Sequence, residues 1–281
     1  MKVKGIGAPR DENGGMSQIP EPASTASAPA PGPESPARRA LVTGASTGIG
    51  AATVRLLRSH GWDVVATARR VERLEALTAE TGCAWAAADL QRPQDVERLA
   101  DEVLAAGPVD AVVNNAGGAL GLDPVADADP AEWLTMCERN ALAALRVTRA
   151  FLPGLRERGG DVVFLTSTAA HGTYPGGAGY VAAKHAERVI ANTLRLELVG
   201  EPVRIIEIAP GMVATEEFSL NRFHGDRAAA DAVYAGVEAP LTAADVAECI
   251  VWTLERPAHV NIDSLTVRPR AQASNTVVAR H

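Results

Sequence analysis

Cysteine is scarce in this chain of 281 residues. The three cysteines, Cys83, Cys137 and Cys249, are odd in number and far apart, and none belongs to a C-x-x-C pair. This pattern excludes a disulfide framework, and we expect no metal site. It is typical of a protein of the reducing cytoplasm, which is the location we predict.

Excess positive charge and long apolar runs are also missing. The formal net charge is -7, whereas non-specific binding to nucleic acid or to an anionic membrane needs a basic face. No apolar run approaches the ~20 residues that a membrane-spanning helix requires. We therefore expect a small-molecule partner, with no nucleic-acid partner and no membrane partner.

The N-terminal segment contains little that could be buried. Residues 17–37 read SQIPEPASTASAPAPGPESPA and are dominated by Pro, Ala, Ser and Glu. Such a composition cannot offset the entropy lost on ordering, so residues 1–37 are predicted to form a disordered tail. One folded domain is expected over residues 38–272, followed by a C-terminal tail at 273–281.

Short β-branched runs alternate with longer helical patterns through the rest of the chain. Strands are predicted at residues 40–43, 63–68, 83–88, 110–115, 161–167, 203–209 and 261–267. Helices are predicted at residues 48–59, 71–81, 93–106, 130–150, 177–199 and 243–255. Continuous apolar strands separated by such helices are typical of βαβ units. The predicted fold is α/β and doubly wound, with a seven-stranded parallel sheet and helices on both faces.

One stretch, residues 216–240, breaks this alternation and is rich in Ala, Asp and Arg. In a doubly wound fold, an insertion there would lie near the carboxyl ends of the strands, where ligands bind. We therefore expect a substrate lid at about residues 212–240.

A glycine-rich turn follows the first predicted strand. Residues 43–50 read TGASTGIG and open a helix. Gly44, Gly48 and Gly50 suit a tight turn in which the backbone approaches a diphosphate, and the helix N-terminus presents unpaired N–H groups to that anion. A plain glycine turn would contain the same residues, but the position after the first strand favours nucleotide binding.

The spacing TGxxxGxG resembles that of the short-chain dehydrogenase/reductase family, whose fold is a single Rossmann-type domain. Further motifs of that family follow in order: DL at 89–90, NNAG at 114–117, the Y-x-x-x-K pair at 180–184 and PGMVAT at 210–215. The cofactor-binding residues that the resemblance implies are Gly44, Ser46, Thr47, Gly48, Ile49, Gly50, Asp89, Leu90, Asn114, Ala116, Gly117, Tyr180, Lys184, Pro210, Gly211, Val213 and Thr215. Taken alone, Asp89 could equally be a strand-end or capping aspartate.

Tyr180 and Lys184 lie four residues apart in the stretch GYVAAKH, so on a helix they share one face. An ammonium beside a phenol lowers the phenol pKa, although an ordinary helix face can show the same spacing. The resemblance implies that Tyr180 is the general acid/base, and that Lys184 lowers its pKa toward the working pH and binds the nicotinamide ribose. It also implies that Ser167 stabilises the oxyanion and that Asn140 holds a water leading to Lys184.

The cofactor is predicted to be NADP. The second strand ends in the sequence ATARR, which offers Ala68 where NAD enzymes place a carboxylate, followed by Arg69 and Arg70. Arginine forks suit a 2′-phosphate. The competing interpretation is that Arg69 and Arg70 are only the basic start of a helix and lie in solvent. Thr47 also weakens the prediction, because some NADP enzymes of the family carry a basic residue there.

Residues 240–273 resemble the branch of the family that contains NADP-dependent 3-hydroxy acid dehydrogenases. This implies an oxidoreductase acting on the CH–OH group of a small 3-hydroxy acid or a related aldehyde or ketone. The candidate substrate residues are Ser167, His171, Tyr174, Met212 and Arg222. A small acid needs a cation for its carboxylate, and Arg222 or Arg227 could supply one, although both could also be solvated lid charges.

Two other functions stay open. One is reduction of a bulkier secondary-metabolite ketone, and the other is a non-catalytic dinucleotide sensor, which is disfavoured because all four catalytic positions are filled. The family implies a homodimer or homotetramer, assembled through the helices at 130–150 and 177–199. Their alanine-rich faces permit close packing.

Overall fold

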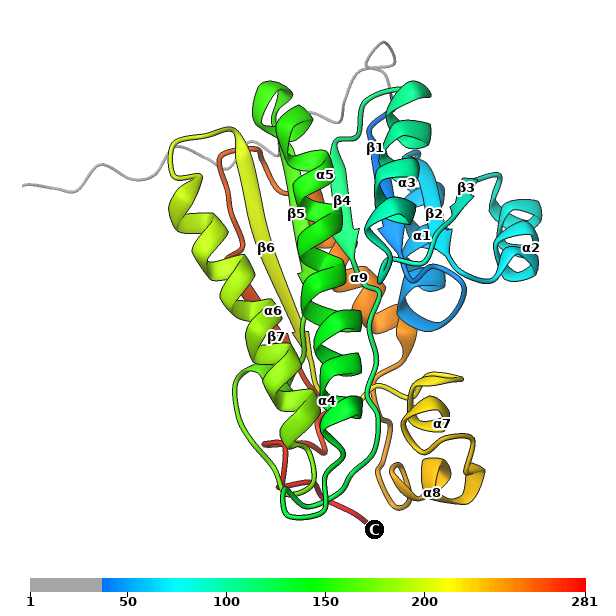
Figure 1. Cartoon of the computed structure of the whole chain (residues 1–281), viewed down its shortest axis with the longest axis vertical. Coiled ribbons are helices and arrows are strands. Elements are labelled where there is room, and N and C mark those ends of the chain that lie inside the picture. Colours follow the sequence, from blue (N-terminus) through cyan, green and yellow to red (C-terminus); the bar gives the residue numbers. More distant parts are fainter. Residues whose placement is uncertain (1–36) are drawn as a thin grey trace, which may run out of the picture. The chain divides into compact units, whose positions relative to one another are not determined.

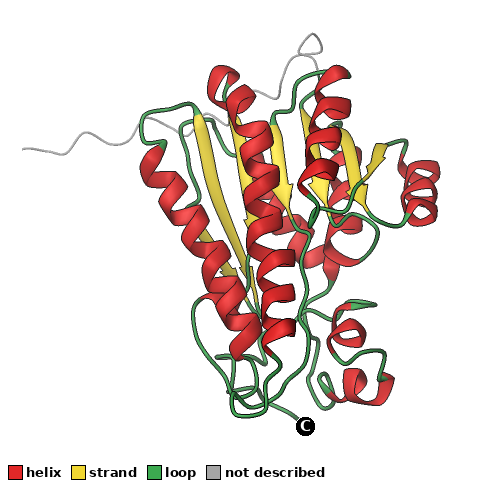
Figure 2. Ribbon diagram, viewed as in Figure 1, coloured by secondary structure: helices red, strands yellow, loops and turns green. Residues whose placement is uncertain are grey.

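The structure, a computed structural model, describes residues 37–281, so the predicted N-terminal tail lies outside the described residues except for its last position. Seven strands form one parallel sheet in the order β3-β2-β1-β4-β5-β6-β7 (Figure 2). Their bounds are β1 (Arg39–Thr43), β2 (Asp63–Ala68), β3 (Ala84–Ala87), β4 (Ala111–Asn114), β5 (Gly160–Leu165), β6 (Val203–Pro210) and β7 (Ser264–Val267). The predicted fold is confirmed, with small shifts at the strand ends.

The connecting helices also follow the predicted pattern. They are α1 (Gly48–Ser59), α2 (Val71–Thr81), α3 (Pro93–Ala105), α4 (Pro130–Cys137), α5 (Ala143–Arg158), α6 (Ala178–Glu197) and α9 (Ala243–Leu254). The single helix expected at 130–150 is interrupted by a π-helical segment, Glu138–Leu142, and then continues to Arg158. Among the described residues, no helix is both long and apolar enough to cross a membrane.

Alternate side chains of the strands enter two apolar cores, one on each face of the sheet. On β1, Val42 packs with side chains from α1, α2 and α9, whereas its neighbour Leu41 packs with side chains from α3, α5 and α6. This alternation explains why the central strands β1 and β4 are largely apolar: both of their faces are covered. In Figure 1 the front layer is formed by α3, α5 and α6.

The order of the strands fixes where a ligand can bind. From β1 the chain moves outward through β2 and β3, and it then returns to the other side of β1 as β4. The connections on either side of this switch point lead away from each other and leave a crevice at the carboxyl ends of β1 and β4. The segment 212–240 lies beyond that edge and contains two short helices, α7 (Phe218–Arg222) and α8 (Arg227–Ala232) (Figure 1).

The C-terminal segment, expected as a tail, folds back over the same edge. Gln272 forms a bridge with Val278, and the backbone N–H of His281 donates to Gly236 in the 212–240 segment at 2.9 Å. The side chain of Asn275 donates to the carbonyl oxygens of Thr168 (3.1 Å) and Gly172 (3.0 Å). These contacts bring the last residues of the chain to the region that a substrate would enter.

Candidate active site

The glycine turn between β1 and α1 has no room for a side chain at Gly44 or Gly50. Gly44 has a φ of +64°, and a Cβ there would lie 2.8 Å from the Cα of Ala116. A Cβ on Gly50 would lie 2.4 Å from the carbonyl oxygen of Gly44. The side chain of Thr47 makes no cap bond to the first turn of α1, so N–H groups at the helix start are available to an anion.

The two asparagines after β4 have different roles. Asn114, predicted to bind cofactor, is buried, and its amide donates to the hydroxyl of Thr148 at 2.9 Å. Asn115, which the sequence analysis did not select, lines the cavity, and its amide donates to the carbonyl oxygen of Thr43 at 2.7 Å. Asn114 therefore ties β4 to α5, while Asn115 holds the glycine turn against the cavity.

A single cavity of about 500 Å³ extends from the glycine turn to the 212–240 segment. It collects most of the predicted residues, although they come from six separate stretches of the chain. Those that line it are Gly44, Thr47, Gly48, Ile49, Ala116, Gly117, Ser167, Tyr174, Tyr180, Lys184, Pro210, Gly211, Met212, Val213, Thr215 and Arg222. Gln272, Asn275 and Arg280 of the C-terminal segment also line it, and no sequence motif indicated them.

Tyr180 and Lys184 share one face of α6, as their spacing predicted. They are 7% and 4% exposed, and the Lys184 ammonium lies 6.0 Å from the centre of the Tyr180 ring. Lys184 is the only lysine among the described residues, in a part of the chain that otherwise uses arginine.

The pKa of Tyr180 differs from the sequence-based expectation. Burial raises it above the ordinary value, and the charge of Lys184 lowers it by less than burial raises it. Burial lowers the pKa of Lys184, but the charge of Glu187, the charge of Tyr180 and the hydrogen bond to Glu187 together outweigh burial and raise it overall. In the absence of a cofactor charge, Tyr180 is therefore a neutral phenol. It can donate a proton, but it cannot accept one until it has ionised.

Ser167 and Asn140 are both held by backbone groups. The hydroxyl of Ser167 accepts from the N–H of Ala169 at 3.1 Å, which leaves its own proton available toward the cavity or toward Pro210. Asn140 is fully buried in the π-helical segment, where its amide donates to the carbonyl oxygens of Gly118 (2.9 Å) and Met136 (2.8 Å). Because its side-chain donors are occupied, the water link from Asn140 to Lys184 stays a prediction.

Arg70, one of the two residues predicted to bind the 2′-phosphate, lies at the start of α2 and forms an ion pair with Glu217 of the 212–240 segment. Its guanidinium donates to both carboxylate oxygens of Glu217, at 2.8 Å each, and to the hydroxyl of Ser46 at 3.0 Å. The hydrogen bond from Arg70 lowers the pKa of Glu217, so the carboxylate is ionised. A bidentate anion site therefore exists at the end of β2, and a carboxylate of the same chain fills it. Arg69, the other residue predicted to bind the 2′-phosphate, is exposed at the same turn.

The DL pair lies at the end of β3, outside the cavity lining. Asp89 accepts from the backbone N–H of Gln91 at 3.2 Å, and Leu90 is buried in the core of the α3 face. Both residues shape the loop, and contact with an adenine ring stays a prediction.

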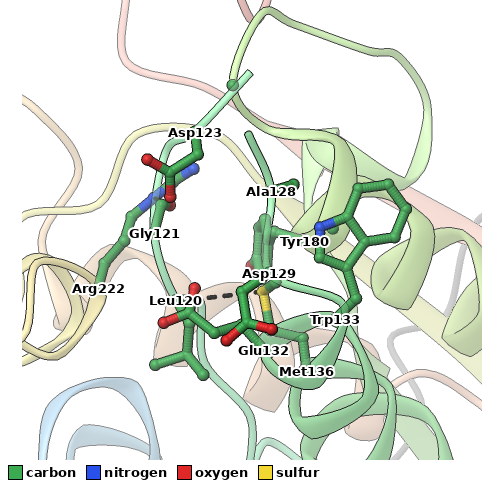
Figure 3. A pocket seen from close by; sticks show the side chains of 12 residues that line it. Leu120, Gly121, Asp123, Ala128, Asp129, Glu132, Trp133, Met136, Tyr180 and Arg222 are labelled. Carbon is green, nitrogen blue, oxygen red and sulfur yellow. Dashed lines mark hydrogen bonds between the residues drawn. The ribbon is translucent and has the colours of Figure 1, made fainter. Parts of the chain in front are cut away.

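Two predicted substrate residues behave differently. His171, expected on the substrate side, does not line the cavity, because its ring binds the buried carboxylate of Glu207 at 3.0 Å. Arg222 does line it: its guanidinium donates to the carbonyl oxygen of Gly121 (3.0 Å) and to the hydroxyl of Tyr174 (3.2 Å). Figure 3 shows Arg222 extended beside the segment of Gly121 and Asp123.

Comparisons with known proteins agree with this site. The family model described as short chain dehydrogenase matches residues 38–222. An uncharacterized oxidoreductase of Mycobacterium tuberculosis is 54% identical, over 87% of this chain and 96% of its own length. A serine 3-dehydrogenase of Rhizobium radiobacter is 42% identical, over 83% of this chain and 94% of its own.

Among solved structures, the closed form of a serine dehydrogenase complexed with NADP+ superposes with a TM-score of 0.80 at 38% identity, covering 86% of this chain and 99% of that one. The cofactor predicted from ATARR is the one bound in that neighbour. The family match, the sheet order and the residues gathered around one cavity lead to the same conclusion: this chain belongs to the short-chain dehydrogenase family.

Proposed function

We propose that this chain is an NADP(H)-dependent oxidoreductase that interconverts the alcohol and carbonyl forms of a small substrate carrying an acidic group. The observation that carries the proposal is the shared cavity, where Tyr180, Lys184 and Ser167 face the same space as the glycine turn and Arg222. The relatives named above, a serine 3-dehydrogenase and an NADP+-bound serine dehydrogenase, support it.

The residues present fit a dinucleotide. The turn packs closely against Asn115 and Ala116 because Gly44 and Gly50 carry no Cβ, and the start of α1 offers N–H groups to a diphosphate. Arg69, Arg70 and Ser46 would hold the 2′-phosphate, with Arg70 exchanging the carboxylate of Glu217 for it. When bound, the nicotinamide supplies or accepts the hydride.

The side chains supply the proton chemistry. On reduction, Tyr180 donates a proton to the oxygen of the former carbonyl, and on oxidation it takes the proton from the alcohol. Ser167 donates a hydrogen bond to the same oxygen as negative charge develops on it, an interaction worth about 3 kcal/mol of barrier in comparable sites. Lys184 stabilises the phenolate electrostatically, and a cationic nicotinamide nearby would act in the same direction.

Arg222 is the candidate for binding the acidic group. Its guanidinium carbon lies 5.9 Å from the centre of the Tyr180 ring, so a molecule of a few atoms could reach both. Within residues 37–281 no carboxylate lies within ion-pair distance of Arg222, in contrast to Arg70. A guanidinium with free donors beside the reacting phenol is suited to a carboxylate.

The test compares serine with serinamide, which lacks the carboxylate charge, using NADP as the cofactor. Serine should give the higher kcat/KM. Arg222→Met should lower kcat/KM for serine by about 10- to 100-fold, the value of a charge-assisted hydrogen bond, and leave serinamide unchanged. Arg227→Met is the matched control, since Arg227 is exposed on α8 and does not line the cavity. Equal use of both compounds, or higher activity with a polycyclic ketone, would contradict the proposal in favour of the bulky-ketone alternative.

We also infer that the chain forms a homodimer or homotetramer through the faces of α4 and α6. Apolar side chains stand exposed there, with Leu134 at 73%, Val189 at 61% and Leu196 at 77%. Light scattering should give a multiple of the chain mass of 29.3 kDa. Replacing Val189 and Leu196 by Glu should shift the mass toward that of one chain.

A further inference from the structure

A buried glutamate stands directly behind the catalytic lysine. Glu187 follows Lys184 by one turn of α6 and is fully buried. Its Oε2 accepts a hydrogen bond from the Lys184 ammonium at 2.7 Å, and that ammonium also donates to the carbonyl oxygen of Leu165 at 2.8 Å. Two of the three donors of Lys184 are therefore committed to the interior of the protein.

A second buried carboxylate, Glu207 on β6, faces this pair. Its Oε1 accepts from the hydroxyl of Thr166 at 2.7 Å and is 3.0 Å from the ring of His171. The Nε of Arg188 lies 3.8 Å from its other oxygen. Within the described residues, Oε1 of Glu187 and Oε2 of Glu207 have no hydrogen-bond partner. Two buried carboxylates thus lie near Lys184, and only one of them is hydrogen-bonded to its ammonium.

These charges act on the proton equilibria of the active site. Burial raises the pKa of Glu187 to about 7, and the charge of Glu207 adds to the rise while Lys184 opposes it. Above this pH Glu187 is an anion, and its charge raises the pKa of Tyr180 in addition to the larger effect of burial. The negative charge of Glu187 therefore offsets part of the effect by which the Lys184 ammonium favours ionisation of Tyr180.

We propose that Glu187 is a positioning residue of this active site: it holds the Lys184 ammonium and raises the pH at which the Tyr180–Lys184 pair releases its first proton. Removing this negative charge makes the phenolate easier to form and the ammonium easier to deprotonate. Both changes move the first proton loss of the pair to lower pH, whichever of the two groups gives it up. The proposal rests on the proposed function only in assigning Tyr180 the acid-base role.

Two spectroscopic titrations of the free enzyme test this directly. The chain has only three tyrosines, so the tyrosinate absorbance of a variant minus that of its Tyr180→Phe counterpart reports Tyr180. Lys184 is the only lysine between residues 37 and 281, so lysine labelling gives an NMR signal that Lys184→Arg identifies. In Glu187→Gln, the first transition of the pair should occur about one pH unit lower than in the wild type. Glu197→Gln, at the exposed end of the same helix, should cause no shift.

An unchanged or higher transition in Glu187→Gln would overturn the proposal, because a purely structural role changes stability without changing the titration. If that variant does not fold, the NMR signal of Lys184 in the wild type gives the answer: it should shift near pH 7, where the neighbouring Glu187 ionises. A Lys184 signal that does not change through this pH range would likewise overturn the proposal. Since neither titration uses substrate or cofactor, a failure of the serine experiment leaves this test unaffected.

Discussion

Two cation–glutamate pairs flank the cavity, and they differ in their access to water. The side chains of Lys184 and Glu187 are 5% and 0% exposed, whereas those of Arg70 and Glu217 are 43% and 17% exposed. A buried pair is costly to break, because the remaining charge cannot be solvated. A half-exposed pair contributes only about 0–1 kcal/mol and weakens in salt. The first pair is therefore a fixed part of the catalytic site, and the second can exchange its anion for a phosphate.

The largest effect should come from breaking the buried pair at its cation. Lys184→Met leaves the buried carboxylate of Glu187 with no ammonium beside it, which should cost about 3–5 kcal/mol of unfolding free energy and abolish turnover. The loss should be smallest in acid. Burial raises the pKa of Glu187, so the folded variant keeps a proton on this carboxyl at pH values where the unfolded chain has lost it. The free energy of unfolding of Lys184→Met therefore falls as the pH rises above about 4.5, by up to about 1.4 kcal/mol per pH unit, until Glu187 ionises.

Urea unfolding of Lys184→Met and wild type at pH 5 and pH 8 measures this difference. A stability gap that does not widen between the two pH values would contradict the description of Glu187 as buried and paired.

The second-largest effect should come from replacing Arg70, the cation of the half-exposed Arg70–Glu217 pair. Arg70→Ala removes the guanidinium fork that we assign to the 2′-phosphate, so kcat/KM with NADPH should fall about 10- to 100-fold while the value with NADH changes little. Arg55→Ala is the matched control, because Arg55 makes an equivalent bidentate pair with Glu80 away from the cavity. An equal loss with both cofactors would remove Arg70 from the phosphate site.

The smallest effect should come from the anion of the same pair. Glu217→Gln removes the carboxylate that competes with the 2′-phosphate, so the Kd for 2′,5′-ADP should fall a few-fold at low salt, and the gain should shrink as salt rises. The Kd for 5′-ADP should stay the same. Weaker binding of 2′,5′-ADP in this variant would mean that Glu217 helps to hold the phosphate site together instead of competing for it.

The sequence predicted the features that depend on local pattern. Most strands contain a short apolar or β-branched run, the glycine turn has a fixed spacing, and Tyr180 and Lys184 share a helix face whatever the rest of the fold does. The alternation of strands and helices also led us to expect a ligand site near the carboxyl ends of the strands, but only the observed strand order places the crevice between β1 and β4.

Features that depend on contacts between distant segments could not be predicted in this way. The spacing of Glu187 from Lys184 is visible in the sequence, but only the fold buries this pair and places Glu187 near Glu207. His171 was expected beside substrate because of its position in the chain, but Glu207, on a neighbouring strand, draws its ring away. The C-terminal segment has no periodic pattern, so its return over the cavity depends on single contacts such as that of Asn275 with Thr168.

The central claim is that Tyr180 carries the proton while the hydride passes at the nicotinamide, and Tyr180→Phe tests it most directly. The measurement is single-turnover oxidation of NADPH with an accepted carbonyl substrate, alongside the Kd for NADPH. We predict that the Kd stays within about two-fold of the wild type while the rate falls by at least about 100-fold, the usual contribution of a positioned acid. A rate near that of the wild type with unchanged NADPH binding would contradict the account.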